Sequence, residues 1–158
     1  MSPGKSLENK ITKTNFKYLK KNLACIQFLD TPVTITNQGA FLTSSTVDFI
    51  GCVAPTGRGI AFDAKHTLNA NSFPLSNIKD HQILFLDLWE KSGGLAYFII
   101  QFSKNQGTDH AFLTPFSFVK GYWDAAKKGV GKKSIKYELF NSSWKVELTD
   151  YLNLKKEE

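Results

Sequence analysis

The stretch from Leu95 to Phe102 reads LAYFIIQF, a nearly continuous apolar run rich in aromatic and β-branched side chains. Because side chains alternate between the two faces of a strand, such a run predicts a strand that is buried on both faces. Gly93 and Gly94 precede it and end a helical stretch that begins after Asn77, the expected N-cap, and is apolar nearly all round. We therefore expect a mixed α/β fold, with a central sheet and helices packed on both of its faces.

The length and composition fit one intracellular domain. A chain of 158 residues with 42% hydrophobic residues can bury a core of its own, so we expect a single domain over residues 1–158. No stretch has the pattern of a signal peptide or the length of a membrane span, and Cys25 and Cys52 form neither a disulfide framework nor a zinc set. The formal net charge of +6 favours a polyanionic partner.

Two lysine-rich segments are candidates for contact with that partner. A basic amphipathic helix is expected over residues 4–23, and a basic loop, KKGVGKKS, over 127–134. The loop is not a nucleotide-binding P-loop, because Ala126 stands at the first glycine position and Lys133 where Ser or Thr should follow. A solvated helix face and a mobile solvated loop are the alternative interpretations. The predicted phosphate-binding side chains are Lys10, Lys13, Lys17, Lys127, Lys128, Lys132 and Lys133.

Acidic and basic side chains gather in the stretch from residue 46 to residue 82. Period-two alternation places Thr46 and Asp48 on one face of an expected strand, which follows a first strand at residues 25–35 that is interrupted at 30–32. After a turn rich in Pro and Gly, the same alternation places Asp63 and Lys65 together on a second strand. The resulting hairpin would bring Asp63 beside Asp48.

Two neighbouring carboxylates and a lysine suit divalent-metal phosphodiester chemistry. Mg²⁺ is usually held by one or two carboxylates together with water and substrate phosphate, and an adjacent lysine stabilises developing charge. The spacing alone leaves open a hairpin with a solvated polar face, because strands with an acid and a lysine two residues apart are common.

The wider motif set resembles the RecU family of Holliday junction resolvases, within the PD-(D/E)xK, restriction-endonuclease-like superfamily. The resemblance covers nearly the whole chain, from Gly4–Glu8 through Gly94–Ile100 to Lys133–Ile135 and Asp150–Leu152. Its central motifs, in chain order, are Thr46-x-Asp48, Asp63-x-Lys65 with Thr67, Ser72-Phe73-Pro74-Leu75, and His81-Gln82.

This resemblance implies a restriction-endonuclease-like central mixed sheet and a homodimeric, magnesium-dependent endonuclease that resolves four-way DNA junctions by paired symmetric nicks. It further implies that Mg²⁺, or alternatively Mn²⁺, is held by Thr46, Asp48, Asp63 and Gln82, and that Lys65 stabilises the transition state. Glu8 matches a family position on the first helix and is a candidate accessory acid. The expected location is the bacterial cytoplasm, in association with the nucleoid.

Two departures from the family pattern keep other functions open. Asp63 replaces the usual glutamate, and the interval from Thr36 to Ser45, where the family carries a longer basic stalk, contains no charged residue. The short stalk suits a phage-encoded member and favours, as an alternative, a related nuclease of broader branched or duplex DNA specificity. A DNA-binding or strand-annealing protein without cleavage is the third possibility.

Overall fold

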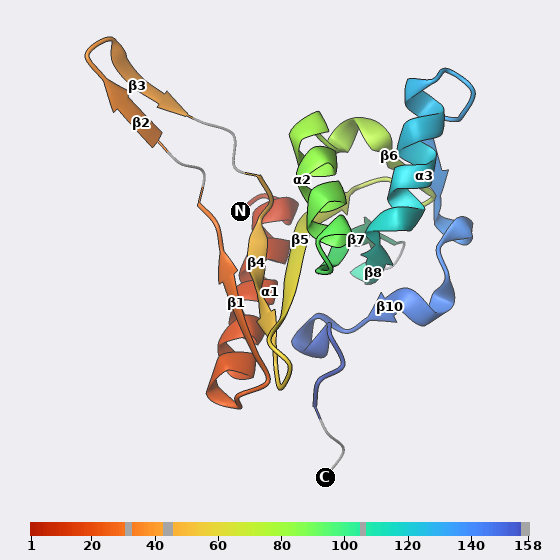
Figure 1. Ribbon diagram of the computed structural model, residues 1–158. Helices are drawn as coiled ribbons and strands as arrows, with labels where there is room; N and C mark the ends of the chain where they lie inside the picture. The colour runs from red at the N-terminus through yellow and green to blue at the C-terminus, as the bar shows by residue number, and fades with distance from the viewer. Residues whose placement is uncertain (31–32, 43–45, 105–106, 156–158) are drawn as a thin grey trace.

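A six-stranded sheet forms the centre of the computed structural model, which describes residues 1–30, 33–42, 46–104 and 107–155 (Figure 1). The strand order is β1-β4-β5-β7-β8-β10. The pair β5–β7 is parallel and the other neighbours are antiparallel, so the sheet is mixed, as predicted. The strands are β1 (Ala24–Phe28), β4 (Phe49–Val53), β5 (Arg58–Thr67), β7 (Leu95–Ser103), β8 (Asp109–Pro115) and β10 (Lys145–Val146).

Helices cover both faces of this sheet, which confirms the predicted α/β class. Helix α1 (Pro3–Lys20) shares a core with Phe62 and Ile99, whereas α2 (Asp80–Lys91) and α3 (Phe116–Lys127) share a core with Ala61 and Phe98. The predicted two-sided burial of the 95–102 stretch is thereby confirmed, because alternate residues of β7 enter opposite cores. Among the described residues, no helix is both long and apolar enough to cross a bilayer.

The β4–β5 hairpin forms in the register that the sequence predicts. Phe49 pairs with Phe62, and one further step of this register places Asp48 opposite Asp63. Strand β4 begins only at Phe49, however, so Thr46 and Asp48 precede the strand rather than alternate within it. Asp48 is nevertheless held in place, because its carbonyl accepts a 2.7 Å hydrogen bond from the Leu29 N–H beyond the end of β1.

A second hairpin replaces the predicted interrupted first strand. Strands β2 (Val33–Thr36) and β3 (Gly39–Leu42) pair only with each other, in a two-stranded sheet that extends away from the central sheet (Figure 1). The prediction that 25–35 form one strand was wrong, since β1 pairs with β4 whereas β2 pairs with β3. Residues 43–45 of the expected stalk interval, and 156–158 of the expected C-terminal segment, lie outside the described residues.

Helix α2 differs from its prediction at its start and on its outer face. A 3₁₀ turn, η1 (Leu75–Asn77), precedes it, and its N-cap is Lys79 instead of Asn77. Leu84 and Leu88 are 71% and 66% exposed, so the expectation of all-round burial was wrong. The reason is that only one side of α2 meets the sheet, and no further layer covers the opposite side among the described residues.

The C-terminal segment packs on its own chain. Strands β6 (Ser72–Pro74) and β9 (Ser134–Lys136) pair with each other, and the segment continues through the 3₁₀ turns η3 (Tyr137–Leu139), η4 (Ser142–Trp144) and η5 (Leu148–Asp150). Tyr151 is fully buried and its hydroxyl donates to Asn15 of α1, while Tyr18 of the same helix donates to Asp150 at 2.7 Å. Tyr151 and Asp150 therefore pack against α1 of their own chain.

Candidate active site

Asp48 and Asp63 are joined through reciprocal backbone contacts across the hairpin. The Asp48 N–H donates to Asp63 Oδ1 at 3.0 Å, and the Ala64 N–H donates to Asp48 Oδ2 at 2.9 Å. Asp63 is only 1% exposed because β5 is covered by α1 on one face and by α2 on the other. A buried carboxylate needs a compensating charge, so its position in the core is costly unless a cation accompanies it.

Lys65 supplies one such cation. Its Nζ lies 2.8 Å from Asp63 Oδ2, and its side chain is 15% exposed. Asp63 Oδ2 accepts no hydrogen bond within the described residues, so the ion pair with Lys65 is the contact that stabilises this buried oxygen. The structure thus brings Asp48, Asp63 and Lys65 together, as the alternation along β5 and the hairpin register predict.

Among the described residues, Asp48 has no ion pair like the one between Lys65 and Asp63. Burial raises the pKa of Asp48 well above the usual range for aspartate, and the neighbouring Asp63 carboxylate raises it further, against the opposing effect of the Ala64 N–H. The Glu8 carboxylate also contributes to this raised pKa, which places the candidate accessory acid near the pair. Glu8 is partly exposed, and its nearest ion pair is a 3.7 Å contact with Lys5.

The raised pKa has a consequence for stability. A carboxyl group whose pKa is higher in the folded state stabilises the fold fully below its unfolded pKa, near 4, and loses that contribution as the pH rises through the folded value of about 8. We expect Asp48→Asn to unfold at a higher temperature than the wild type at pH 9, by at least roughly 2–4 °C, equivalent to about 1 kcal/mol.

The same comparison at pH 5 should show a smaller difference, because Asp48 is then largely protonated in the wild type. Thermal unfolding of both proteins in EDTA at the two pH values measures this. A stabilisation that is equal at pH 5 and pH 9 contradicts an electrostatic origin. Excess Mg²⁺ at pH 9 should reduce the difference in melting temperature between Asp48→Asn and the wild type, since a ligand bound only by the folded wild type raises the melting temperature of the wild type.

Gln82 and Thr46 are the other two predicted metal ligands. Gln82 is buried on α2, and its Oε1 accepts the Lys79 N–H at 3.0 Å, which closes the first turn of the helix. Its amide oxygen therefore already accepts one hydrogen bond, which leaves its second lone pair for a metal. Thr46 is exposed and precedes β4. Their roles as ligands stay predictions from the family resemblance.

The Asp48–Asp63 pair supplies two neighbouring carboxylates as possible metal ligands. No group of three or more His, Cys, Asp or Glu side chains in the described part of the chain is arranged to hold a metal ion. Mg²⁺ is characteristically bound by one or two carboxylates and keeps several waters, so two adjacent aspartates are a donor set that it accepts. The expected hairpin and the alternation along β5 together predicted this pair, whereas the orienting Ala64 N–H, a backbone group, leaves no signal in the sequence.

The predicted DNA-binding lysines form two separate groups, one on α1 and one at the end of α3 and in the loop that follows it. Lys10, Lys13 and Lys17 are exposed along α1, which rises about 1.5 Å per residue away from Glu8. The second group, in the loop after α3, is anchored beside the start of α2. Lys127 pairs with Asp80 at 3.2 Å, and the Lys133 carbonyl accepts the Leu75 N–H at 2.9 Å.

The sequence matches a known family along almost its entire length. A family model described as RecU, Recombination protein U, matches residues 2–155. The chain belongs to the RecU family. RecU from Pediococcus pentosaceus, named as a Holliday junction resolvase, is 35% identical over 87% of this chain and 71% of its own length.

Other members are related to a similar degree. The Holliday junction resolvases RecU of Oceanobacillus iheyensis and Staphylococcus aureus (strain JH9) are 34% and 35% identical, over 88% and 84% of this chain and 74% and 66% of their own lengths. A structure of the Holliday junction resolvase Hjc of Archaeoglobus fulgidus aligns over 90% of this chain and 97% of that chain, with 11% identity and a TM-score of 0.47. A score this low does not decide the fold, which rests on the strand order itself.

Proposed function

We propose that this protein is a metal-dependent endodeoxyribonuclease that resolves four-way (Holliday) DNA junctions in recombination and repair. The observation that carries the proposal is the Asp48–Asp63 pair, in which Asp63 is buried and Asp48 half-buried, with Lys65 Nζ 2.8 Å from Asp63 Oδ2, within a chain of the RecU family. A binding module has no need for two adjacent carboxylates near DNA phosphates, because like charges there raise the energy of the bound complex. The cellular site that suits this activity is the nucleoid of the bacterial cytoplasm.

The carboxylates of Asp48 and Asp63 would hold Mg²⁺ or Mn²⁺, with the Gln82 amide and the Thr46 hydroxyl as further ligands. When bound, the ion polarises the scissile phosphate and lowers the pKa of a bound water. The Ala64 N–H fixes one oxygen of Asp48, and the Asp48 N–H fixes one oxygen of Asp63, so both carboxylates have defined orientations before the ion arrives. Lys65 is preorganised on the same strand to neutralise charge that develops on the phosphate.

The hairpin β2–β3 supports the first alternative, a nuclease of broader branched or duplex DNA specificity. Its sequence from residue 33 to residue 42, VTITNQGAFL, carries no charged side chain. An uncharged hairpin gives no electrostatic attraction to the phosphates at a junction centre. Junction selectivity would then depend on the lysine groups and on the arrangement of two subunits.

The decisive experiment compares substrates that differ only in branching. An end-labelled immobile four-way junction and a linear duplex of one arm sequence are incubated with the protein, with and without Mg²⁺. Paired nicks at symmetric positions in the junction alone support resolution. Equal cleavage of both substrates supports the broader nuclease, and tight binding without cleavage in Mg²⁺ or Mn²⁺ supports the non-cleaving alternative.

We also propose that two subunits act on each junction, since a four-way junction is two-fold symmetric and symmetric nicks need two sites related in the same way. Mixing wild-type subunits with an excess of Asp63→Asn subunits is expected to convert paired cleavage into single nicks. A supercoiled cruciform plasmid reports this directly, because paired cleavage linearises it and one nick relaxes it. Sedimentation that shows a monomer on the junction would contradict this arrangement.

The two lysine groups predict a steep dependence of junction binding on salt. Six phosphate contacts correspond to a slope of roughly −5 for log affinity against log salt. Replacing three lysines of the loop (Lys128, Lys132 and Lys133) with glutamine should reduce that slope by about 3, and the same replacement of Lys10, Lys13 and Lys17 by a similar amount. Filter-binding titrations from low to moderate salt measure both slopes. A triple variant with an unchanged slope removes its group from the DNA contact.

A further inference from the structure

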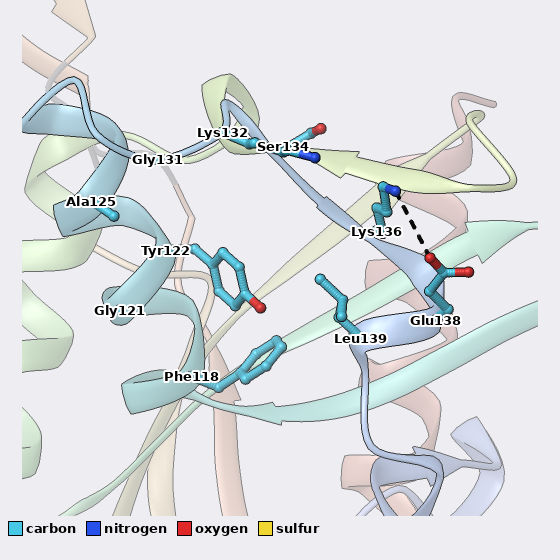
Figure 2. A pocket seen from close by; sticks show the side chains of 10 residues that line it. All are labelled: Phe118, Gly121, Tyr122, Ala125, Gly131, Lys132, Ser134, Lys136, Glu138 and Leu139. Atoms are coloured by element: carbon cyan, nitrogen blue, oxygen red, sulfur yellow. Dashed lines mark ion pairs between the residues drawn. The ribbon is translucent and has the colours of Figure 1, made fainter.

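A pocket lies on the side of α3 that faces away from α2. It has a volume of about 510 Å³, within the range of about 300–1,000 Å³ for small-ligand pockets. Phe118 and Tyr122 of α3 line one side, and Leu139 of η3 lines the other (Figure 2). The two aromatic rings contact each other edge to face, with centroids 5.2 Å apart, and both are only partly buried. The pocket thus offers ring surface to a ligand.

Glycine keeps this pocket open. Gly121 lies on α3 between the two aromatic positions, and a Cβ built there would meet no atom within 4 Å. A glycine inside a helix costs about 1 kcal/mol relative to alanine. Gly121 therefore destabilises α3, although no close contact requires a glycine at this position. Gly131 of the basic loop also lines the pocket, and a Cβ built at this position would come within 2.7 Å of the Ala125 Cβ.

The rim of the pocket is basic. The segment from residue 125 to residue 137 reads AAKKGVGKKSIKY, with five lysines and no acid. Lys132 and Lys136 line the pocket itself. The one acid at the rim, Glu138, lies 3.9 Å from Lys136 and is compensated by it, as the dashed line in Figure 2 marks. Val130, at 81% exposure, is an apolar side chain in the middle of this basic loop.

We propose that this pocket binds an unpaired nucleotide of DNA, with the base against Tyr122 and Phe118 and its phosphates on Lys132 and Lys136, the two lysines that line the pocket. Aromatic faces beside a basic track are the recurring design of single-strand binding sites, because every base has a face for stacking and every nucleotide a phosphate. An apolar peptide would cover the rings but would give no counter-charge to Lys132, which lines the pocket and forms no ion pair among the described residues. The inference rests on the proposed function only in taking DNA as the ligand.

The test uses two substitutions of one residue. Both Gly121→Ala and Gly121→Leu should stabilise α3, because alanine and leucine are better helix formers than glycine. Only leucine extends far enough from position 121 to occupy the pocket volume beside the rings. Affinity for a 15-nucleotide oligothymidine, measured by fluorescence anisotropy without divalent metal, is expected to fall about tenfold in Gly121→Leu, within the range lost when one base loses its stacking partner. The affinity of Gly121→Ala for the same oligonucleotide should stay within about twofold of the wild-type affinity, because a Cβ at this position meets no atom within 4 Å.

An abasic oligonucleotide of equal length isolates the contribution of the base. It should bind the two variants equally, since its phosphates are unchanged. An oligonucleotide with 5-iodouridine is expected to crosslink to Tyr122 on irradiation, with the adduct located by mass spectrometry. Equal affinity of both variants for oligothymidine overturns the proposal, as does an equal loss for the abasic chain. A change of oligomeric state in Gly121→Leu alone also overturns it, in favour of an interface between copies.

These measurements are independent of cleavage. A protein that fails to cut junctions but loses oligothymidine affinity in Gly121→Leu keeps the nucleotide pocket and refutes the nuclease. A protein that cuts junctions normally while Gly121→Leu and Gly121→Ala bind oligothymidine alike keeps the nuclease and refutes the pocket.

Discussion

Asp63→Asn is expected to lower the rate of junction cleavage by on the order of a thousandfold or more, the scale lost when a group at the reacting centre is removed. Asparagine has nearly the same shape, so its carbonyl can still accept the Asp48 N–H that now lies 3.0 Å from Asp63 Oδ1. The change removes the charge that holds Lys65 at 2.8 Å and that would hold the metal. Since the lost charge is negative, junction affinity should stay equal or increase.

The appropriate control is Asp87→Asn, which makes the same change in charge on α2. Asp87 is partly exposed and pairs with Lys91 at 2.7 Å, an i,i+4 surface contact worth a few tenths of a kcal/mol. Cleavage by this variant should remain within about twofold of the wild type, as surface ion pairs contribute little. Single-turnover kinetics with excess protein separate the chemical step from binding. A near wild-type rate for Asp63→Asn would remove this residue from the site.

Local periodicity predicted the parts of the site that depend on neighbouring residues. Alternation along β5 placed Asp63 and Lys65 on one face, and the short turn after β4 fixed the register that brings Asp48 opposite Asp63. Alternation could not predict that Asp63 is buried, because the face opposite Ile60 and Phe62 is covered by α2, which comes later in the chain. The depth of the acid is therefore a tertiary property.

Contacts between distant residues account for the rest of what the sequence did not predict. Tyr151 contacts Asn15 across 136 residues, and neither belongs to a periodic pattern that indicates the other. The start of α2 was misplaced because Asn77 is the better N-cap residue by type, whereas Gln82 satisfies the Lys79 N–H instead. The separate β2–β3 hairpin was missed because strand propensity indicates extended backbone but not the pairing partner.

Lys65 should prove separable from the metal ligands, because an ammonium group cannot coordinate a cation. Replacement by methionine keeps most of the buried stem, whose side chain is 15% exposed, and removes the charge that lies 2.8 Å from Asp63 Oδ2. We expect junction affinity to be nearly unchanged. Metal affinity should be equal or higher, since the metal ion no longer competes with the Lys65 ammonium group for Asp63 Oδ2. The cleavage rate should fall by on the order of a hundredfold or more, the effect of deleting one preorganised electrostatic contact.

A metal titration under single-turnover conditions distinguishes the two roles. Asp63→Asn weakens the site for the ion itself, so higher Mg²⁺ or Mn²⁺ should restore part of its activity. Lys65→Met should reach its lower plateau at the same metal concentration as the wild type or below it, and more metal should not raise that plateau. If added metal restores Lys65→Met, this lysine organises the ligands. If the variant fails to bind the junction, Lys65 is a phosphate anchor, and in either case its assignment to the transition state is wrong.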